Sequence, residues 1–482
     1  MRAQLTEDEM NNYEMTVGLE VHAELSTKTK IFCSCPTDFG APPNTQICPI
    51  CMGLPGTLPV LNRRAVEFAI KAGLATNCKI AHRASLDRKN YFYPDLPKGY
   101  QISQYARPIC YDGSIEFEGE SGRERVELER IHIEEDAGKL IHDREGVTLA
   151  DYNRCGRPLI EIVSRPQIHS AESARAYLKK LRTLLLAVGV SDCKMNEGSL
   201  RCDVNISVKR ADEEKLGERT EIKNLNSFAF VAKAIENEFA RQCEMLERGE
   251  RIVRQTLRFN AASGKCEIMR SKESAVDYRY FPEPDLADIL ITDSDVEAIR
   301  TEIPELPDQR RERYVKEIGL ADADAAILSS DVALSDYFDR AASVTDHKRT
   351  VANMLISEGL RLSVGEDFFC PIAPEKFGRL CELFASEMIN SSTAKKLLVR
   401  MWSEPALEPD KVAESEALWQ INDREELEKI AVAAIEQSRK AVEDYRSGKS
   451  FALKSIVGKA MAASGGRANP RIVEQLILEK IK

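Results

Sequence analysis

The chain has 482 residues, too many for one compact core, so we expect about two to four domains. Charged residues make up 30% of it and hydrophobic residues 43%, a balance that is typical of a soluble globular protein and excludes a disordered one. The formal net charge of -10 excludes a protein that coats nucleic acid with its whole surface, although it leaves room for a local basic patch.

The sequence carries no signal for export or for a membrane. No stretch approaches the roughly 18 consecutive apolar residues that a membrane span needs. The first segment, residues 1–12, is acidic and polar. The cysteines lack the even spacing of a secreted disulfide framework, so we expect reduced thiols in a cytoplasmic protein that contacts no membrane.

The first part of the chain, to about Asp285, combines strand-like and helix-like patterns. Apolar and polar side chains alternate in residues 16–25, so Glu20 and His22 share one face of a predicted strand. Further strands are expected at 131–134, 158–163 and 200–207, and helices at 63–75, 170–188 and 229–248. We predict an α+β fold that opens with a large, β-rich, cradle-like domain over residues 1–292.

From about Asp293 the periodicity becomes helical. Pro304 and Pro307 occupy positions that helix starts tolerate, and we predict a helical domain over residues 293–402. Residues 403–410 are polar and contain two prolines, which is typical of a linker.

Residues 411–482 are expected to form a small helical tail domain. Its apolar side chains recur on one helix face, at Leu427, Ile430, Ala431, Ala434 and Ile435. Residues 439–482 contain ten Lys or Arg against four Asp or Glu, which reverses the sign of the acidic chain. This reversal favours contact with a nucleic-acid backbone, and the alternative is a solvated pair of basic helices.

Four cysteines lie close together, whereas the other nine are scattered singly. The four are Cys33, Cys35, Cys48 and Cys51, two close pairs with the spacing of a tetrahedral zinc site. Four sulfur ligands leave no open coordination position, so such an ion would be structural. The alternative is a group of four buried, reduced cysteines.

Acidic and imidazole side chains lie on the polar faces of the predicted strands. One pair alone, such as Glu20 and His22, is more often part of a solvated sheet face than a ligand set. Other strands add His132, Glu134, Glu135, Asp136, Glu161, Asp203 and Asn205. If these strands meet, hard oxygen ligands that converge with an imidazole suit Mg²⁺ that holds nucleotide phosphates.

Two segments, residues 87–103 and 277–285, are dense in aromatic, basic and proline residues. This composition suits stacking on a nucleobase or on the end of an RNA. The alternative for each segment is a loop whose aromatic side chains pack into the core.

The sequence contains no P-loop, no Gly-x-Ser-x-Gly elbow and no serine–lysine amidase signature, so any ATP is held without a P-loop and acyl hydrolysis is unsupported.

Together and in this order, these segments resemble the B subunit of the glutamyl-/aspartyl-tRNA amidotransferases over nearly the whole chain. The blocks that carry the resemblance are GLEVH (18–22), DRKNYFYPD (87–95), YQIS (100–103), HIEEDAGK (132–139), PLIEIVS (158–164), EGSLRCDVNIS (197–207), EIKNLNS (221–227), DYRYFPEPD (277–285) and GGRANP (465–470). Some members of that family carry the four-cysteine cluster and others lack it, which implies a role outside catalysis.

The resemblance implies an ATP-dependent carbon–nitrogen ligase with glutamine as amide donor. Its substrate would be a mischarged tRNA, Glu-tRNA(Gln), Asp-tRNA(Asn) or both, and not DNA. ATP would phosphorylate the side-chain carboxylate, and ammonia would then displace phosphate. The phosphate supplies the leaving group that a carboxylate lacks, and Mg²⁺ neutralises the charge gathered at the transfer.

The resemblance also implies partners in a heterotrimer. An amidase (glutaminase) subunit would release ammonia from glutamine into a closed channel, and a small third subunit would clamp the pair. The basic tail would contact the outer corner of the tRNA.

Carried over to this sequence, the resemblance assigns catalysis to Glu20, His22, Glu134, Glu135, Glu161, Asp203 and Asn205. The Mg²⁺ ligands would be Glu20, His22 and Glu161, completed by Glu134 or Glu135. Neighbours on a strand face opposite ways, and we take Glu135 as the working assignment. Contacts to ATP, phosphate or the tRNA end are expected from Lys89, Tyr91, Tyr93, Lys98 and Arg279.

Two other functions compete with this interpretation. A zinc-stabilised tRNA-binding scaffold without chemistry would leave the acidic strand faces unexplained, because they repel phosphate unless a metal intervenes. A free-standing ligase of small substrates would leave the basic tail without a purpose.

Overall fold

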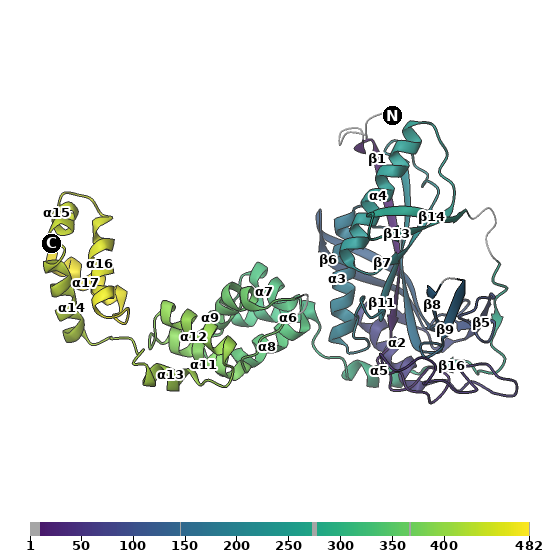
Figure 1. The fold of residues 1–482 in the computed structure, drawn as a ribbon, viewed down its shortest axis with the longest axis horizontal. Helices are drawn as coiled ribbons and strands as arrows, with labels where there is room; N and C mark the ends of the chain where they lie inside the picture. The colour runs from purple at the N-terminus through teal and green to yellow at the C-terminus, as the bar shows by residue number, and fades with distance from the viewer. Residues whose placement is uncertain (1–9, 145, 272–276, 366–367, 482) are drawn as a thin grey trace. The chain divides into compact units, whose positions relative to one another are not determined.

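The computed structural model describes residues 10–144, 146–271, 277–365 and 368–481 (Figure 1). The chain divides into two compact units, Met1–Leu306 and Pro307–Lys482. The first unit combines a large sheet with helices and the second is helical, which confirms the predicted α+β class. None of the helices within these ranges combines the length and the apolarity that a bilayer crossing requires.

A nine-stranded sheet forms the frame of the first unit. Its central strands are antiparallel neighbours, while β12 and β13 run parallel. The order across the sheet is β14 (Lys265–Ser271), β13 (Gln255–Asn260), β12 (Thr220–Leu225), β11 (Leu200–Arg210), β1 (Tyr13–Glu24), β10 (Pro158–Ser164), β7 (Gly122–Glu135), β6 (Cys110–Gly119) and β2 (Lys79–Ile80).

The alternation of apolar and polar residues decides which face of this sheet is buried. On β1 the side chains of Leu19, Val21 and Ala23 are fully buried, whereas Glu20 and His22 are half-buried. Three helices pack their apolar sides on the sheet: α2 (Arg63–Ala75), α3 (Ala171–Ala187) and α4 (Phe228–Glu247). Figure 1 shows α3 and α4 lying along the sheet. The polar side chains of the central strands therefore point away from these helices.

Capping residues set the starts of these three helices. The side chains of Asn62, Ser170 and Ser227 accept hydrogen bonds from backbone N–H groups in the first turns of α2, α3 and α4. These N–H groups have no partner inside the helix, and one such cap typically contributes about 1 kcal/mol. The helix positions predicted from the sequence are confirmed to within a residue or two at each end.

Smaller sheets connect distant segments of the first unit. The strand β4 (Asp87–Asn90) pairs with β5 (Tyr100–Ser103) on one side and with β15 (Phe281–Pro282) on the other. This sheet brings together the two aromatic segments that the sequence singled out. Two further pairs are β3 (Arg83–Ala84) with β16 (Ile289–Leu290) and β8 (Lys139–Arg144) with β9 (Val147–Asp151).

The helix α5 (Asp293–Thr301) packs within the first unit. Ile299 is buried in the same core as the large sheet, and Glu302, just after the helix, forms a 2.7 Å ion pair with the buried Lys71 of α2. The first compact unit thus extends past the predicted boundary at residue 292, to Leu306.

The second unit contains two separate hydrophobic cores. The first of them, which we call the middle core, involves helices from η1 to α13, and the second, the tail core, involves α14 to α17. The elements are α6 (Pro307–Arg313), the π-helix η1 (Tyr314–Ile318), α7 (Asp322–Ser329), α8 (Val332–Ala342), α9 (Lys348–Met354), the π-helix η2 (Leu355–Gly359), α10 (Leu360–Leu362), α11 (Pro374–Ala385), α12 (Ser391–Ser403), α13 (Pro409–Ser415), α14 (Arg424–Glu436), α15 (Arg439–Arg446), α16 (Ala452–Ala463) and α17 (Pro470–Ile481).

The predicted linker, residues 403–410, connects two helices that both contribute to the middle core, and its Leu407 packs against that core. Val412 and Ala413 of α13, which follow it, are buried in that core, and Arg379 of α11 binds Asp410 at 2.7 Å. The chain passes to the tail core only after Trp419. The three predicted domain ranges themselves stay a prediction.

Candidate functional site on the polar face of the sheet

Strand register gathers the predicted catalytic residues at the centre of the sheet. His22 of β1 lies opposite Glu161 of β10, and Glu161 lies opposite His132 of β7. On the other side of β1, Glu20 lies opposite Asp203 of β11. Four strands that are far apart in the sequence therefore present their polar residues to one place, as the alternation patterns allowed but could not establish.

The first group at this centre is built around His22. Its Nε2 lies 3.4 Å from Glu134 Oε1 and 3.4 Å from Glu161 Oε2. His132 Nε2 lies 3.3 Å from the same Glu161 oxygen, while its buried Nδ1 has no hydrogen-bond partner among the described residues. His22, Glu134 and Glu161 each offer a ligand atom within 4.8 Å of the others, a donor set that fits a divalent cation.

The charges of this group are mutually dependent. Burial alone would lower the pKa of His22, but the carboxylates of Glu161 and Glu134 outweigh burial and raise that pKa to about 9. Burial opposes ionisation of Glu161, yet the imidazoles of His132 and His22 hold the pKa of Glu161 well below its usual range. The pKa values of His22 and Glu161 thus shift in the directions that favour a charged imidazole–carboxylate pair.

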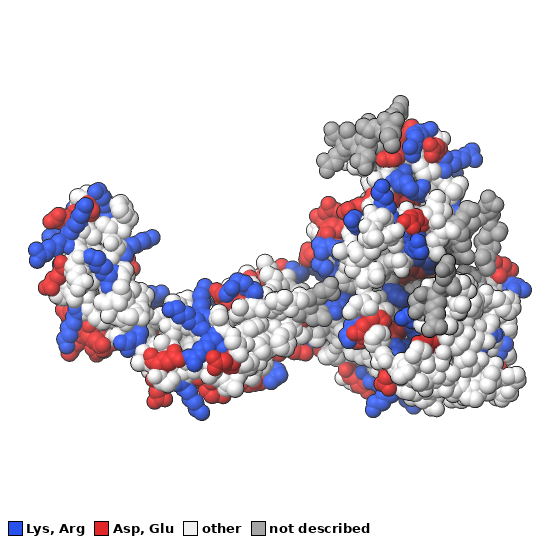
Figure 2. Space-filling view, in the orientation of Figure 1, with Lys and Arg blue, Asp and Glu red and all other residues white. Residues whose placement is uncertain are grey.

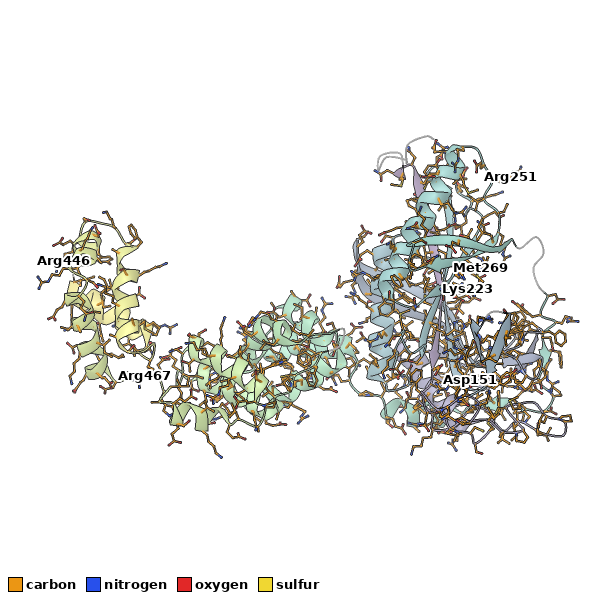
Figure 3. The ribbon with its side chains drawn as sticks, viewed as in Figure 1. Asp151, Lys223, Arg251, Met269, Arg446 and Arg467 are labelled. Atoms are coloured by element: carbon orange, nitrogen blue, oxygen red, sulfur yellow. The ribbon has the colours of Figure 1, made fainter. Side chains whose placement is uncertain are left out.

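A second group lies beside the first, on β1, β11 and β12. Glu20, Asp203 and Glu221 place carboxylate oxygens within 4.8 Å of one another. Asn205 Nδ2 donates a hydrogen bond to Glu20 Oε1 at 2.9 Å. Lys223, labelled in Figure 3, contacts Asp203 and lies 2.9 Å from Glu221 Oε1. Three carboxylates against one ammonium leave this group with surplus negative charge.

That surplus affects Glu20. Burial and the carboxylates of Glu161 and Asp203 raise the pKa of Glu20, because each disfavours a further negative charge there. Crowded carboxylates of this kind are what a divalent cation relieves, so the second group also fits Mg²⁺.

Glu134 and Glu135 point to opposite faces of β7. Glu134 belongs to the His22 group, whereas Glu135 forms an ion pair with Lys98, with Nζ 2.7 Å from Oε2. Glu135 Oε1 also accepts a hydrogen bond from the backbone N–H of Ile102 on β5. Glu135 and Lys98 therefore form an ion pair with each other, and this pair lies away from His22.

The two aromatic segments meet next to the His22 group. The ammonium of Lys89 lies 5.0 Å from the ring of Tyr278 and 5.9 Å from the ring of Tyr91. Burial would lower the pKa of Lys89, but the carboxylates of Glu134 and Glu161 raise it, which places the ammonium within electrostatic reach of both. Of the predicted nucleotide contacts, Lys89 and Tyr91 lie at the centre.

Two other predicted contacts have exposed side chains. Tyr93 is exposed, and Arg279 is exposed with φ of 46°, a left-handed conformation that is uncommon for a residue with a side chain. The carbonyl of Arg279 accepts a hydrogen bond from Asn90, so its backbone shapes the loop between Tyr278 and Tyr280.

The cysteine cluster lies in the segment between β1 and α2. Cys33, Cys35, Cys48 and Cys51 hold their sulfur atoms within 4.8 Å of one another, a donor set that fits a tetrahedral metal ion. The fully buried Lys30 places its Nζ 3.7 Å from Cys51 Sγ.

Hydrogen bonds and charge within the cluster act on its thiols. A hydrogen bond from Cys33, together with the charge of Lys30, lowers the pKa of Cys51 to about 4. Burial raises the pKa of Cys35 to about 11. All thirteen cysteines of the chain are free thiols.

Sequence reasoning missed several residues of this face. Glu221 and Lys223 lie in the block EIKNLNS (221–227), for which the sequence analysis predicts no role. Tyr278 and Tyr280 flank Arg279, and only Arg279 is among the predicted contacts. The signal in the first case is the alternation of Glu221 and Lys223 along β12, which matches that of Asp203 and Asn205 on β11. Only the pairing of β11 with β12 turns this pattern into a shared site.

The sequence is similar to known proteins over nearly its whole length. Residues 15–297 match the family described as "GatB/GatE catalytic domain", and residues 336–481 match the one described as "GatB domain". A relative from Caldicellulosiruptor saccharolyticus, named as the B subunit of an aspartyl/glutamyl-tRNA(Asn/Gln) amidotransferase, is 49% identical over 477 residues, which are 98% of this chain and 99% of the relative.

Other relatives agree with this one. Proteins of the same name from Caldanaerobacter subterraneus subsp. tengcongensis and Carboxydothermus hydrogenoformans are 49% and 48% identical, and each match covers at least 97% of this chain and 99% of the relative. The polar face, with its two groups whose donor atoms fit a cation, lies inside the segment that matches the catalytic domain. The chain therefore belongs to the GatB/GatE family of tRNA amidotransferase subunits.

Proposed function

We propose that this chain is the subunit of a tRNA-dependent amidotransferase that uses ATP to phosphorylate the side-chain carboxylate of Glu-tRNA(Gln), of Asp-tRNA(Asn) or of both. Ammonia then displaces the phosphate and leaves the amide. The observation that carries the proposal is the pair of adjacent cation-binding groups on the polar face, around His22 and around Glu20. Phosphoryl transfer requires positive charge at the phosphates, and two neighbouring cation sites supply it where the protein itself is acidic.

The position of each residue determines the role that we propose for it. His22, Glu134 and Glu161 would hold one Mg²⁺, and Glu20, Asp203 and Glu221 a second. Bound there, the ions would neutralise the phosphate oxygens during transfer. We assign Glu134 to this role in place of Glu135, because Glu135 is already paired with Lys98.

Protein cations complete the site. The ammonium of Lys89 has no ion pair within 4 Å and no hydrogen bond among the described residues, yet it lies close to the Glu134–Glu161 side of the group. It would bind a phosphate oxygen and hold the nucleotide against the first cation. Asn205 would keep Glu20 oriented through its 2.9 Å hydrogen bond.

We propose that the ammonia comes from glutamine, is released by an amidase partner and travels through a closed channel, while a small third subunit clamps the two larger subunits together. The similarity to proteins named as B subunits supports a multi-subunit complex. The absence of an amidase signature from this sequence fits such a division of labour. We expect the complex to work in the cytoplasm, where thiols stay reduced.

The cysteine cluster would bind one structural zinc ion. Its four sulfur ligands leave no coordination position for a substrate, and the cluster lies in a different segment from the His22 group. The tail core would grip the tRNA body through its basic surface, for which the charge balance of residues 439–482 is the support.

The experiment that tests the proposal removes His22. The full-length His22→Ala chain is assembled with its partner subunits, and transfer of the γ-phosphate of labelled ATP to mischarged tRNA is measured without glutamine. We expect transfer to fall on the order of 100-fold or more, because a cation ligand at the phosphates is lost. In a separate assay with glutamine, hydrolysis by the partner should continue.

The matched control is His169→Ala, which removes an exposed imidazole outside the site. This variant should transfer phosphate at the parent rate. Transfer at the parent rate in His22→Ala would contradict the proposed function and would favour a scaffold without chemistry.

A further inference from the structure

Four tyrosines form a cluster beside Lys89. The rings of Tyr91 and Tyr278 meet edge to face at 5.9 Å, and those of Tyr278 and Tyr280 meet edge to face at 6.1 Å. Tyr280 then stacks on Tyr105, with centroids 4.4 Å apart and planes inclined by 11°. The cluster thus runs from the Lys89 ammonium to a stacked pair of rings.

Specific contacts hold the tyrosine loop in place. Arg88 of β4 binds the fully buried carboxylate of Glu283 through two hydrogen bonds, each of 2.7 Å. Asn90 donates to the carbonyl of Arg279 at 2.8 Å, and its backbone N–H donates to that of Tyr278 at 2.9 Å. A bidentate, buried pair of this kind fixes both position and orientation, so Tyr278 and Tyr280 are pre-positioned.

The outer ring of the stack is open. Tyr105 is 56% exposed although Tyr280 stacks on it. A tyrosine that only completed the core would be covered on its outer face as well. Arg130 lies next to this ring, with its guanidinium carbon 6.0 Å from the centroid and a buried Nε that has no hydrogen-bond partner among the described residues. The same guanidinium donates a 3.2 Å hydrogen bond from Nη1 to the carbonyl of Tyr105, which keeps it beside the ring. An exposed aromatic ring beside a guanidinium suits a flat ligand that also carries hydrogen-bond acceptors.

The position of the tyrosine cluster restricts which kinds of ligand could bind there. At one end lies Lys89, within electrostatic reach of Glu134 and Glu161, and at the other lies the open face of Tyr105. A ligand that follows this path would place its phosphate or its aminoacyl end near the cation group and a flat base on the tyrosines. Both substrates of the proposed reaction, ATP and the end of a tRNA, carry an adenine base, which stacks over a large area.

We propose that Tyr105 and Tyr280 form the stacking site for an adenine base of the phosphorylation reaction, with Tyr278 and Tyr91 holding Lys89 toward the phosphate. This inference rests on the proposed function and names the base contact that it needs. The same chemistry serves the adenine of ATP and the terminal adenosine of the tRNA, and binding experiments distinguish the two.

The test measures binding by the full-length chain, not turnover. One probe is a non-hydrolysable ATP analogue with Mg²⁺, and the other is an acceptor-stem minihelix that ends in CCA. Tyr105→Ala should weaken binding of at least one of the two about tenfold, within the range for loss of a base–aromatic stack. Tyr105→Phe keeps the ring and should bind like the parent. Tyr111→Ala, which removes a partly exposed tyrosine on β6, is the matched control and should also bind like the parent.

Each outcome of the binding measurements either supports the inference or overturns it. A loss confined to the ATP analogue assigns the stack to ATP, a loss confined to the minihelix assigns it to the terminal adenosine, and a loss of both that Tyr105→Phe restores assigns it to both. Unchanged binding of both probes, or a loss that Tyr105→Phe does not restore, overturns the inference. A parent chain that binds neither probe would instead overturn the proposed function.

Discussion

The polar face of the first unit and the tail core of the second use charge in opposite ways. At the polar face, His22, Glu134 and Glu161 are at least half-buried, and each depends on the others for its ionisation state. On the tail core, the side chain of Lys454 is exposed, and Figure 2 shows Lys and Arg side chains on the surface of the tail helices. Pairs there, such as Lys480 with Glu428 at 2.6 Å, lie at the surface, where an ion pair contributes about 0–1 kcal/mol.

The polar face and the tail core differ in how many side chains share a function. Buried, mutually dependent charges concentrate a function in a few side chains, so one substitution removes it. Exposed charges of one sign act as a sum, so one substitution changes it slightly and only removal of the whole module has a large effect. The variants described next test this difference between the polar face and the tail core.

The cysteine cluster is the most concentrated case. Cys48→Ser should remove one of four sulfur ligands and release the metal, whose binding free energy in small zinc modules is on the order of 10 kcal/mol. We expect loss of zinc in elemental analysis and a less stable segment between β1 and α2. The scattered Cys266 provides the control, since Cys266→Ser should keep the metal. Parent protein that is reduced, intact and free of zinc would contradict the assignment.

Glu134 and Glu135 form a matched pair of neighbours with different roles. Glu134→Gln should lower phosphate transfer on the order of 100-fold, because it weakens a cation site, and should leave the fold intact. Glu135→Gln should instead lower the free energy of unfolding by about 3–5 kcal/mol, because Lys98 is left buried without its counter-ion. Transfer rates and thermal unfolding of both variants separate the two roles. A reversed pattern would show that Glu135 is the ligand.

Removal of the tail core should have a moderate effect on a different quantity. A chain that ends at Trp419 keeps the middle core whole, whereas an end at Pro409 would also delete Val412 and Ala413 from that core. We expect tRNA affinity to fall at least tenfold (about 1.4 kcal/mol) and its salt dependence to flatten, because phosphate contacts are lost. Zinc content and the stability of the first unit should not change. Equal tRNA affinity and an equal salt slope would refute the role of the tail.

A single exposed lysine of the tail should have the smallest effect. Lys454→Ala should weaken tRNA binding only slightly and reduce the salt slope by about one, regardless of tRNA sequence. The acidic residue Glu474 on α17 supplies a control of opposite charge, since Glu474→Gln should not weaken binding. A large loss from Lys454→Ala alone would mean that the tail, too, concentrates its function in single residues.

Local patterns were sufficient to predict the secondary structure and the polar faces of the strands. The alternation on β1 placed Glu20 and His22 on one face, and the caps at Ser170 and Ser227 set helix starts that the sequence already suggested. The proximity of the four cysteines followed from their spacing. These features depend on residues that lie near one another in the sequence.

Features that depend on register could not be predicted. The choice between Glu134 and Glu135 is made by the docking of β5 on β7, where Lys98 and the N–H of Ile102 capture Glu135. The meeting of residues 87–103 with 277–285 requires pairing across nearly two hundred positions, which no local pattern reports. Lys223 was missed for the same reason.

The central claim is that the polar face activates the tRNA-borne carboxylate and that ammonia delivery is separate. The direct measurement is amide formation on mischarged tRNA with ATP, Mg²⁺ and free ammonium in place of glutamine. A complex whose partner amidase is inactive should form amide under these conditions, whereas a complex with Glu161→Gln in this chain should not. Amide formed at the parent rate by the Glu161→Gln complex would contradict the account.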